Sequence, residues 1–210
     1  SEASAELQPL EALSRGQRLR SGFSWFTTSV AVVFAVAVGA GLLLSGTDVG
    51  MVAQVESSGR PQEVGIVFAA WCAASVVGGL IYGAMHRRIS PMLLLLAMAV
   101  MTLPMSLATD TISLALLSIP AGLLCAPVLS SASERVADLV SEERRGEAMG
   151  WYGSALTSGT ALGAPLAGAA IDGIGPWAGF AFAGVAASLL VLVTLTARRL
   201  GPWKARAAVK

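Results

Sequence analysis

The sequence contains few charged residues, a single histidine and two cysteines. Charged residues make up 13% of the 210 positions, whereas a soluble domain carries about 25%. So little polar surface cannot cover a soluble core, which excludes a soluble globular domain. His86 stands alone, and Cys72 and Cys125 lie inside apolar runs, so we predict no metal site, no cofactor and no disulfide framework. The net charge of +1 provides no basic surface for nucleic acid, and we predict no nucleic-acid partner.

What the sequence has in excess is long apolar runs. Hydrophobic residues are 55% of the chain, and the mean hydropathy is +0.71. They gather in blocks of roughly 18 to 25 residues, the length that a helix needs to cross about 30 Å of hydrocarbon. The run Met92–Met101 does not alternate apolar and polar residues as a barrel strand does. We therefore predict an all-α membrane protein, a six-transmembrane-helix bundle, with spans at about Trp25–Gly46, Val64–Ala84, Pro91–Ala108, Ile112–Ser131, Gly146–Ala170 and Trp177–Leu195.

The basic residues mark one side of this bundle. With six spans, the two termini and the second and fourth loops share a side, which holds 13 of the 14 Lys and Arg residues. Only Arg60 falls on the other side. Loops rich in Lys and Arg stay in the cytoplasm. The charge pattern predicts a multi-pass protein of the cell membrane with both termini cytoplasmic.

Both ends of the chain are polar. We assign residues 1–22 to a cytoplasmic linker, residues 23–197 to the six-helix bundle and residues 198–210 to a basic cytoplasmic tail. The first 20 residues contain no signal-peptide core and no initiator Met, so we expect the chain to begin inside a longer protein or to have been trimmed. Leu7, Leu10 and Leu13 recur every three residues, which fits a helix on the membrane surface as well as a flexible linker.

Small residues recur at four-residue spacing, as expected for helices that pack closely in lipid. The pairs are Gly46 and Gly50, Gly79 and Gly83, Gly146 and Gly150, and Gly159 and Gly163. The fifth span adds a proline, which removes a backbone hydrogen bond and permits a kink. We predict that a neighbouring helix packs tightly around this kink. The kink motif is Gly150, Gly159, Gly163, Pro165 and Gly168.

This pattern resembles the major facilitator superfamily. Exporters of that family carry a glycine and proline motif in their fifth helix with the same spacings, apart from Ala164, which is inserted here before Pro165. In a C-terminal half, the fifth span would be the eleventh helix, the repeat counterpart of the fifth. The loop after the second span also resembles the family's signature loop. Gly79, Arg87 and Arg88 fit it, whereas Gly83 replaces its acid and His86 its second glycine.

The resemblance implies the C-terminal six-helix half of a twelve-helix secondary transporter. The expected function is proton-coupled efflux of a small hydrophobic or drug-like molecule by alternating access. The expected partners are the lipid bilayer, an N-terminal six-helix half in the same chain or a second copy, a small-molecule substrate and protons. The alternatives are a metabolite or sugar importer and a non-transporting membrane scaffold subunit. We predict no enzyme, because no Asp pair or His cluster lies in mid-membrane.

Four polar or aromatic residues are candidates for the substrate or ion pathway. Asp48 is the first, because an unpaired carboxylate within a span faces a cavity or a partner. A span that starts near Trp25 places Asp48 close to the outer boundary, which favours a water-facing charge and leaves a proton-coupling or substrate-contacting acid as the alternative. Thr47 and Gln54 are expected to line the same outer vestibule. Trp71 is a further candidate for substrate contact, with packing as its alternative role.

Charges at the cytoplasmic end form a candidate gate. Glu134 and Asp138 lie four residues apart on one helical face. A solvated helix end is the simpler interpretation. The sharper hypothesis is that one of them pairs with Arg87 or Arg88 and latches the cytoplasmic gate in the outward-open state.

Overall fold

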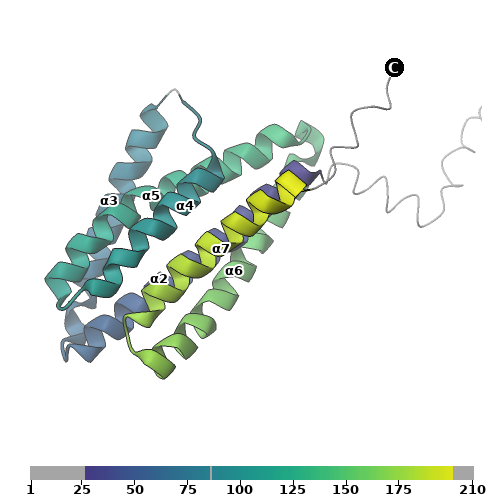
Figure 1. The fold of residues 1–210 in the computed structure, drawn as a ribbon. Coiled ribbons are helices and arrows are strands. Elements are labelled where there is room, and N and C mark those ends of the chain that lie inside the picture. Colours follow the sequence, from purple (N-terminus) through teal and green to yellow (C-terminus); the bar gives the residue numbers. More distant parts are fainter. Residues whose placement is uncertain (1–26, 86, 201–210) are drawn as a thin grey trace, which may run out of the picture.

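The computed structural model describes residues 27–85 and 87–200 of the chain. Within these ranges the chain forms long α-helices and three short 3-10 helices, in a single bundle (Figure 1). The long helices are α2 (Thr28–Ser57), α3 (Val64–Ala84), α4 (Pro91–Thr102), α5 (Thr111–Leu139), α6 (Arg145–Ile174) and α7 (Ala178–Leu200). The 3-10 helices are η1 (Pro61–Glu63), η2 (Leu103–Leu107) and η3 (Glu142–Arg144). The linker, its leucine repeat, His86 and the tail beyond Leu200 lie outside the described residues.

The helices carry the apolar runs, and the prediction of an all-α membrane bundle is confirmed. Four of them are long and apolar enough to cross a membrane, namely Thr28–Ser57, Pro61–Ala84, Thr111–Leu139 and Ala178–Arg198. The continuous pair α4 and η2, Pro91–Leu107, is a shorter apolar segment. Helix α6 has 30 residues but is not among these four, since it is rich in glycine, serine and threonine.

Local sequence signals set the helix boundaries. The Thr27 side chain accepts a hydrogen bond from the Val30 backbone N–H at 3.4 Å and caps α2. Asp110 forms a reciprocal capping box with Ser113 at the start of α5. Pro91 stands at the first position of α4, where no backbone donor is required. Gly175, with φ of 138°, ends α6 in a conformation that other residues rarely adopt.

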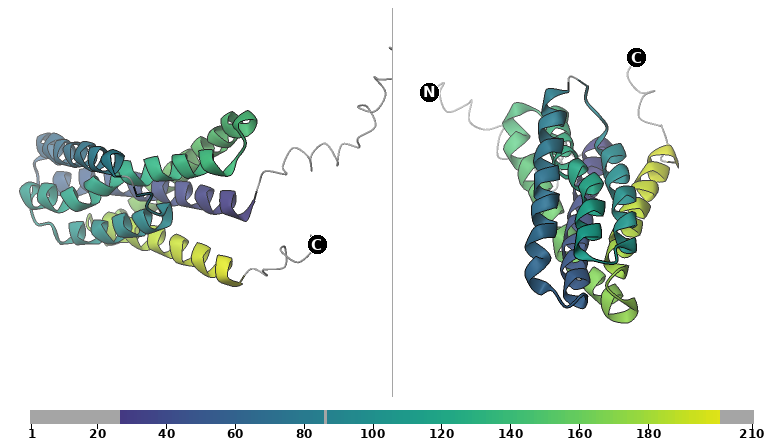
Figure 2. Two further views of the ribbon diagram at one scale, coloured as in Figure 1. Left: turned by 90° about the horizontal axis from the view of Figure 1, so that it is seen from above. Right: turned by 90° about the vertical axis from the view of Figure 1, so that its left-hand side faces the viewer.

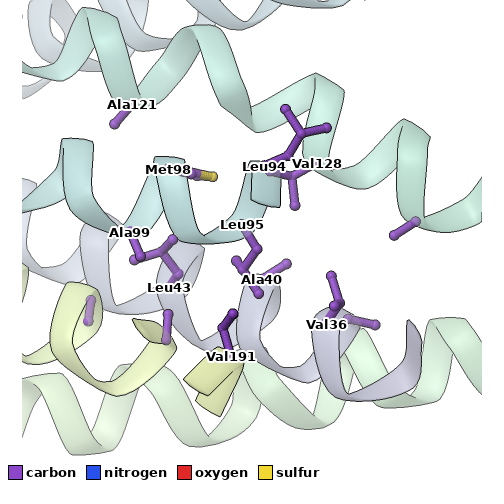
Figure 3. Packing of buried hydrophobic residues seen from close by; sticks show 14 of the residues in the cluster. Val36, Ala40, Leu43, Leu94, Leu95, Met98, Ala99, Ala121, Val128 and Val191 are labelled. Atoms are coloured by element: carbon purple, nitrogen blue, oxygen red, sulfur yellow. The ribbon is translucent and has the colours of Figure 1, made fainter. Parts of the chain in front are cut away.

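The bundle is built from two close helix pairs. Helix α2 packs most extensively against α6, and α3 packs most extensively against α5. Helix α7 packs on α2 and α4. In both views of Figure 2, α3 and α7 lie on opposite sides of the bundle. We call the side away from α4 and α7 the front face. Figure 3 shows the core, where Leu43 of α2, Leu95 and Met98 of α4 and Val191 of α7 are buried together.

Glycines allow the close helix pairs to form. A β-carbon on Gly41 of α2 would collide with the Leu156 carbonyl of α6, and one on Gly159 of α6 would collide with the Val38 carbonyl of α2. The two contacts are reciprocal. Between α3 and α5, Gly78 faces the Leu123 carbonyl in the same way. In lipid, close backbone approach of this kind supplies the van der Waals packing that holds helices together.

Only some of the predicted glycine pairs make helix contacts. Gly159 and Gly163 both meet α2, and Gly46 and Gly50 both meet α7. Gly79 meets Ala126 of α5, but its partner Gly83 faces open space among the described residues, as do both Gly146 and Gly150. Close helix packing, which the spacing predicted for most of these glycines, is therefore found at Gly46, Gly50, Gly79, Gly159 and Gly163 but not at the other three positions. Four-residue spacing marks a smooth stripe but does not determine whether a neighbour lies on it.

The helices alternate in direction, which defines two ends. At one end, called the inner end, the start of α2, the loop before α4, the end of α5 and the end of α7 meet around one cavity. At the other, called the outer end, the Gln54 side chain of α2 donates a hydrogen bond at 3.0 Å to the Ala108 carbonyl before α5. The chain order places the described arginines at the inner end except Arg60, which precedes α3 at the outer end.

Candidate functional site

Asp48 is an exposed carboxylate in the outer half of α2. Its neighbours Gly46 and Gly50 face α7, where a β-carbon would lie 2.9 Å from Ala183 and 3.0 Å from Phe180 respectively. Successive helix residues are about 100° apart, so a residue two positions from each points to the opposite side. Asp48 therefore points toward the front face, away from α7. Among the described residues, it forms no ion pair.

One thiol lies near this carboxylate, and a hydroxyl and a second thiol lie near that thiol. Asp48 is close enough to Cys125 of α5 to interact with it electrostatically. The thiol of Cys125 has the Ser75 side chain of α3 as a hydrogen-bond partner, and Cys72 lies one turn earlier on α3. Residues from α2, α3 and α5 thus form a small polar cluster on a mainly apolar face. We call Asp48, Cys72, Ser75 and Cys125 the front cluster.

The other pathway candidates do not join the front cluster. Thr47 is fully buried, and its hydroxyl donates to the Leu43 carbonyl at 2.7 Å within α2, so it does not line an open vestibule. The Gln54 amide is half-buried and ties α2 to Ala108, which is a structural contact. Trp71 is 6% exposed, and its backbone packs against Gly122 of α5. Trp71 is therefore packed within this bundle, and its contact with substrate stays a prediction.

The charged candidates at the inner end come together in part. An ion pair joins Arg88, in the loop before α4, to Asp138, near the end of α5. It is one of the pairings that the sequence predicted. Glu134 lies one turn earlier on α5 and faces Tyr82 of α3. Arg87 is exposed and does not line the inner cavity, so it stands outside this group.

The inner cavity has a volume of about 300 Å³. Val32, Val33 and Val36 of α2 and Met92 of α4 contribute apolar walls. Polar side chains reach it from α2, α3, α5 and α7 and from the loop before α4. The polar lining consists of Ser29, Tyr82, Arg88, Ser90, Ser131, Glu134, Arg135, Asp138 and Arg198.

The kink motif of α6 divides into two groups. Gly159 and Gly163 lie against α2, as the motif predicted. Gly150 and Gly168 face open space among the described residues, so no described helix packs against them. Pro165 is exposed and lies inside a helix that continues to Ile174. A helix with one contacting stripe buries only the glycines on that stripe, because positions 150 and 168 fall on other faces.

Sequence reasoning missed three features of the site region. Arg198 lines the inner cavity, although its place after the last apolar run indicated only a tail. The Tyr152 hydroxyl of α6 donates to the Leu129 carbonyl of α5 at 3.2 Å and joins the two helices near the inner end. Pro127 lies buried within α5, where it removes the donor for the Leu123 carbonyl that meets Gly78. Of these three features, only Pro127 could have been recognised in the sequence, as a proline inside an apolar run.

Comparisons with known proteins agree with this geometry. The sequence profile of the Major Facilitator Superfamily matches residues 21–210. No curated protein matches the sequence. Among solved structures, 14 chains match. One is a crystal structure of the peptide transporter POT in complex with sulfate, at 17% identity and a TM-score of 0.63, covering 81% of this chain.

This chain covers 37% of the POT chain, so it spans well under half of that transporter's length. At 17% identity the likeness concerns the fold alone. The family profile, by contrast, covers nearly the whole sequence, including every described helix. The chain belongs to the Major Facilitator Superfamily.

Proposed function

We propose that this chain forms the C-terminal six-helix half of a proton-coupled exporter of small hydrophobic molecules. In such a transporter, two six-helix bundles rock around a site between them and expose it alternately to each side of the membrane. The partner half is the N-terminal bundle, in the same polypeptide or as a second copy. The inner end, rich in arginine, faces the cytoplasm.

The observation that carries the proposal is the position of Asp48. A carboxylate within a membrane span is costly unless it faces water, a partner or a substrate. Asp48 is exposed on the front face, and the described residues provide it with no basic partner. A carboxylate in this setting can bind a proton in one conformation and release it in the other. The surrounding Cys125, Ser75 and Cys72 add a weakly polar surface suited to an amphiphilic molecule.

The front face is where we place the partner half. Helices α3 and α6 flank it and leave large side chains exposed, including Val76 (62%) on α3 and Trp151 (47%) on α6. Asp48 lies between these flanks, on α2. A second bundle on this face would enclose the front cluster in a central cavity. The Arg88–Asp138 pair would then act at the inner end as a latch that favours the closed state of the cytoplasmic gate.

The test is dye transport in inverted membrane vesicles from cells that express the complete reading frame containing this chain. We expect an imposed proton gradient to drive ethidium accumulation, and a protonophore to abolish it. Asp48→Asn should lower the gradient-driven transport rate by about tenfold or more, because the amide of the variant cannot bind and release a proton. Asp172→Asn is the matched control, since Asp172 is exposed near the outer end of α6 and lies outside the front cluster.

Other outcomes would favour the other functions. Gradient-driven uptake of a metabolite in the opposite direction would identify an importer. No protonophore-sensitive movement of any tested solute would favour a scaffold subunit. Equal loss of transport in the Asp48→Asn and Asp172→Asn variants would remove the special role of Asp48.

A further inference from the structure

The inner cavity contains positive charge that no described residue pairs with. Its lining holds three guanidinium groups against two carboxylates. Arg88 pairs with Asp138, and Glu134 faces the Tyr82 hydroxyl. Arg135 and Arg198 form no ion pair with any described residue. The only described polar contact of Arg198 is a weak one with the Met92 sulfur at 3.8 Å.

These two arginines come from different helices and reach the same cavity. Arg135 lies on α5, and Arg198 lies near the end of α7. The hydroxyls of Ser29 and Ser90 line the cavity as well. Ser90 is the residue before α4 and makes no side-chain capping bond, so the positive end of the α4 dipole adds to the field. Guanidinium forks, hydroxyls and a helix N-terminus are groups that bind tetrahedral oxyanions.

The cavity lies at the inner end of the bundle, where we expect the lipid headgroups. Its walls include the first nine residues of α2, the first residues of α4 and the last turn of α7, so the ends of these three helices lie together around it. Just deeper in the span, Leu93 of α4 is 60% exposed and Val193 of α7 is 65% exposed. Such side chains present an apolar surface to acyl chains. A volume of about 300 Å³ is large enough for a small polar headgroup.

We propose that the inner cavity binds a phosphate group, held between Arg135 and Arg198. The group is carried by an anionic phospholipid of the adjacent leaflet or arrives as a free phosphate. Once bound, it links α5 to α7 across the end of the bundle, next to the Arg88–Asp138 pair. This site is separate from the front cluster and does not depend on the transport function.

The experiment uses the 210-residue chain purified in detergent and depleted of lipid. Thermal unfolding is followed with added dioleoylphosphatidylglycerol, with added dioleoylphosphatidylcholine and with inorganic phosphate, and retained lipid is counted by native mass spectrometry. We expect phosphatidylglycerol to raise the melting temperature by several degrees and to remain bound. The double variant Arg135→Gln/Arg198→Gln should weaken apparent binding by about tenfold or more.

Matched variants separate this site from general charge effects. Arg60→Gln removes a guanidinium at the outer end, and Arg145→Gln removes one at the inner end outside the cavity. Both should bind like the wild type. The double variant Arg135→Lys/Arg198→Lys keeps the charge and should retain part of the affinity, which shows that the bundle is intact.

Each outcome decides the proposal. Stabilisation by phosphatidylglycerol alone identifies the lipid as the source, and stabilisation by inorganic phosphate alone identifies the free anion. Stabilisation by both shows that the phosphate group suffices. Equal effects of phosphatidylglycerol and phosphatidylcholine, or unchanged binding in the Arg135→Gln/Arg198→Gln variant, would overturn it.

Discussion

The backbone carbonyl of Leu123 on α5 occupies the space that a β-carbon on Gly78 of α3 would need. That carbonyl has no helical donor, because the residue four positions later is Pro127. The proline thus frees the acceptor, and the glycine lets α3 approach it closely enough for a Cα–H contact. Two residues that look unrelated in the sequence create one helix crossing.

Enlarging Gly78 should separate α3 from α5. Gly78→Ala is expected to destabilise the bundle by about 1–3 kcal/mol, because the new methyl group meets backbone that cannot rotate away. Gly83→Ala is the control on the same helix, where the β-carbon meets open space. Thermal unfolding in detergent measures both. Equal melting temperatures for the two variants would show that the crossing is not close.

Alanine substitutions should also distinguish the contacting glycines of the α6 kink motif from those that face open space. Gly159→Ala should lower the melting temperature and the yield of monodisperse protein, since its methyl group would meet the Val38 carbonyl of α2, at a cost of about 1–3 kcal/mol. Gly168→Ala should leave both unchanged or raise them, because alanine favours the helix and nothing described lies within 4 Å. Size-exclusion profiles of the two variants provide the measurement. A larger loss at position 168 would contradict the assigned packing.

The Arg88–Asp138 pair should influence conformation more than stability. Its side chains are 71% and 38% exposed, and such pairs contribute about 0–1 kcal/mol. Asp138→Asn is therefore expected to leave the melting temperature nearly unchanged, while it speeds maleimide labelling of a cysteine placed in the inner vestibule. Neutralising Glu134 tests the other acid in the same assay.

A charge reversal provides the control for the latch. The double variant Arg88→Asp/Asp138→Arg should restore the slow labelling of the wild type, whereas Arg145→Gln, which breaks a pair outside the cavity, should not alter it. If Asp138→Asn labels at the wild-type rate, the latch is absent.

The capping box of α5 should make the outer end sensitive to acid. The Ser113 side chain, followed by its backbone N–H, lowers the pKa of Asp110 below its ordinary value. A depressed folded-state pKa contributes stability that is present above the unfolded pKa of about 3.9 and is lost as the pH falls through the folded value. The melting temperature should therefore fall in acid by an amount that Asp110→Ser does not show.

Asp110→Ser retains a capping oxygen but cannot titrate, whereas Asp110→Ala loses the cap at every pH. The alanine variant should melt below the wild type at neutral pH, and the serine variant close to it. Melting curves between pH 3 and pH 7 would distinguish them. If the melting temperatures of all three proteins fall equally in acid, the titration of Asp110 does not cause the loss of stability.

Composition and local periodicity were enough to predict the class of protein. The apolar runs required helices long enough for a membrane, because lipid leaves backbone groups no other partner. Basic residues such as Arg88 and Arg135 shared one predicted side, and the helix order places them at one end of the bundle. The spacing of Glu134 and Asp138 limited the pairings with Arg88 to a few, of which one is observed. These properties depend on composition and on local periodicity.

Which of these residues meet depends on how the helices pack. Gly159 and Gly168 look equivalent in the sequence, but only Gly159 lies on the stripe that faces α2. Thr47 and Asp48 are neighbours, yet one is buried and the other exposed, because adjacent helix residues point about 100° apart. Arg198 became part of a cavity only when the end of α7 lay beside the start of α4. The direction from which a neighbouring helix arrives is a property of packing, which the local sequence does not encode.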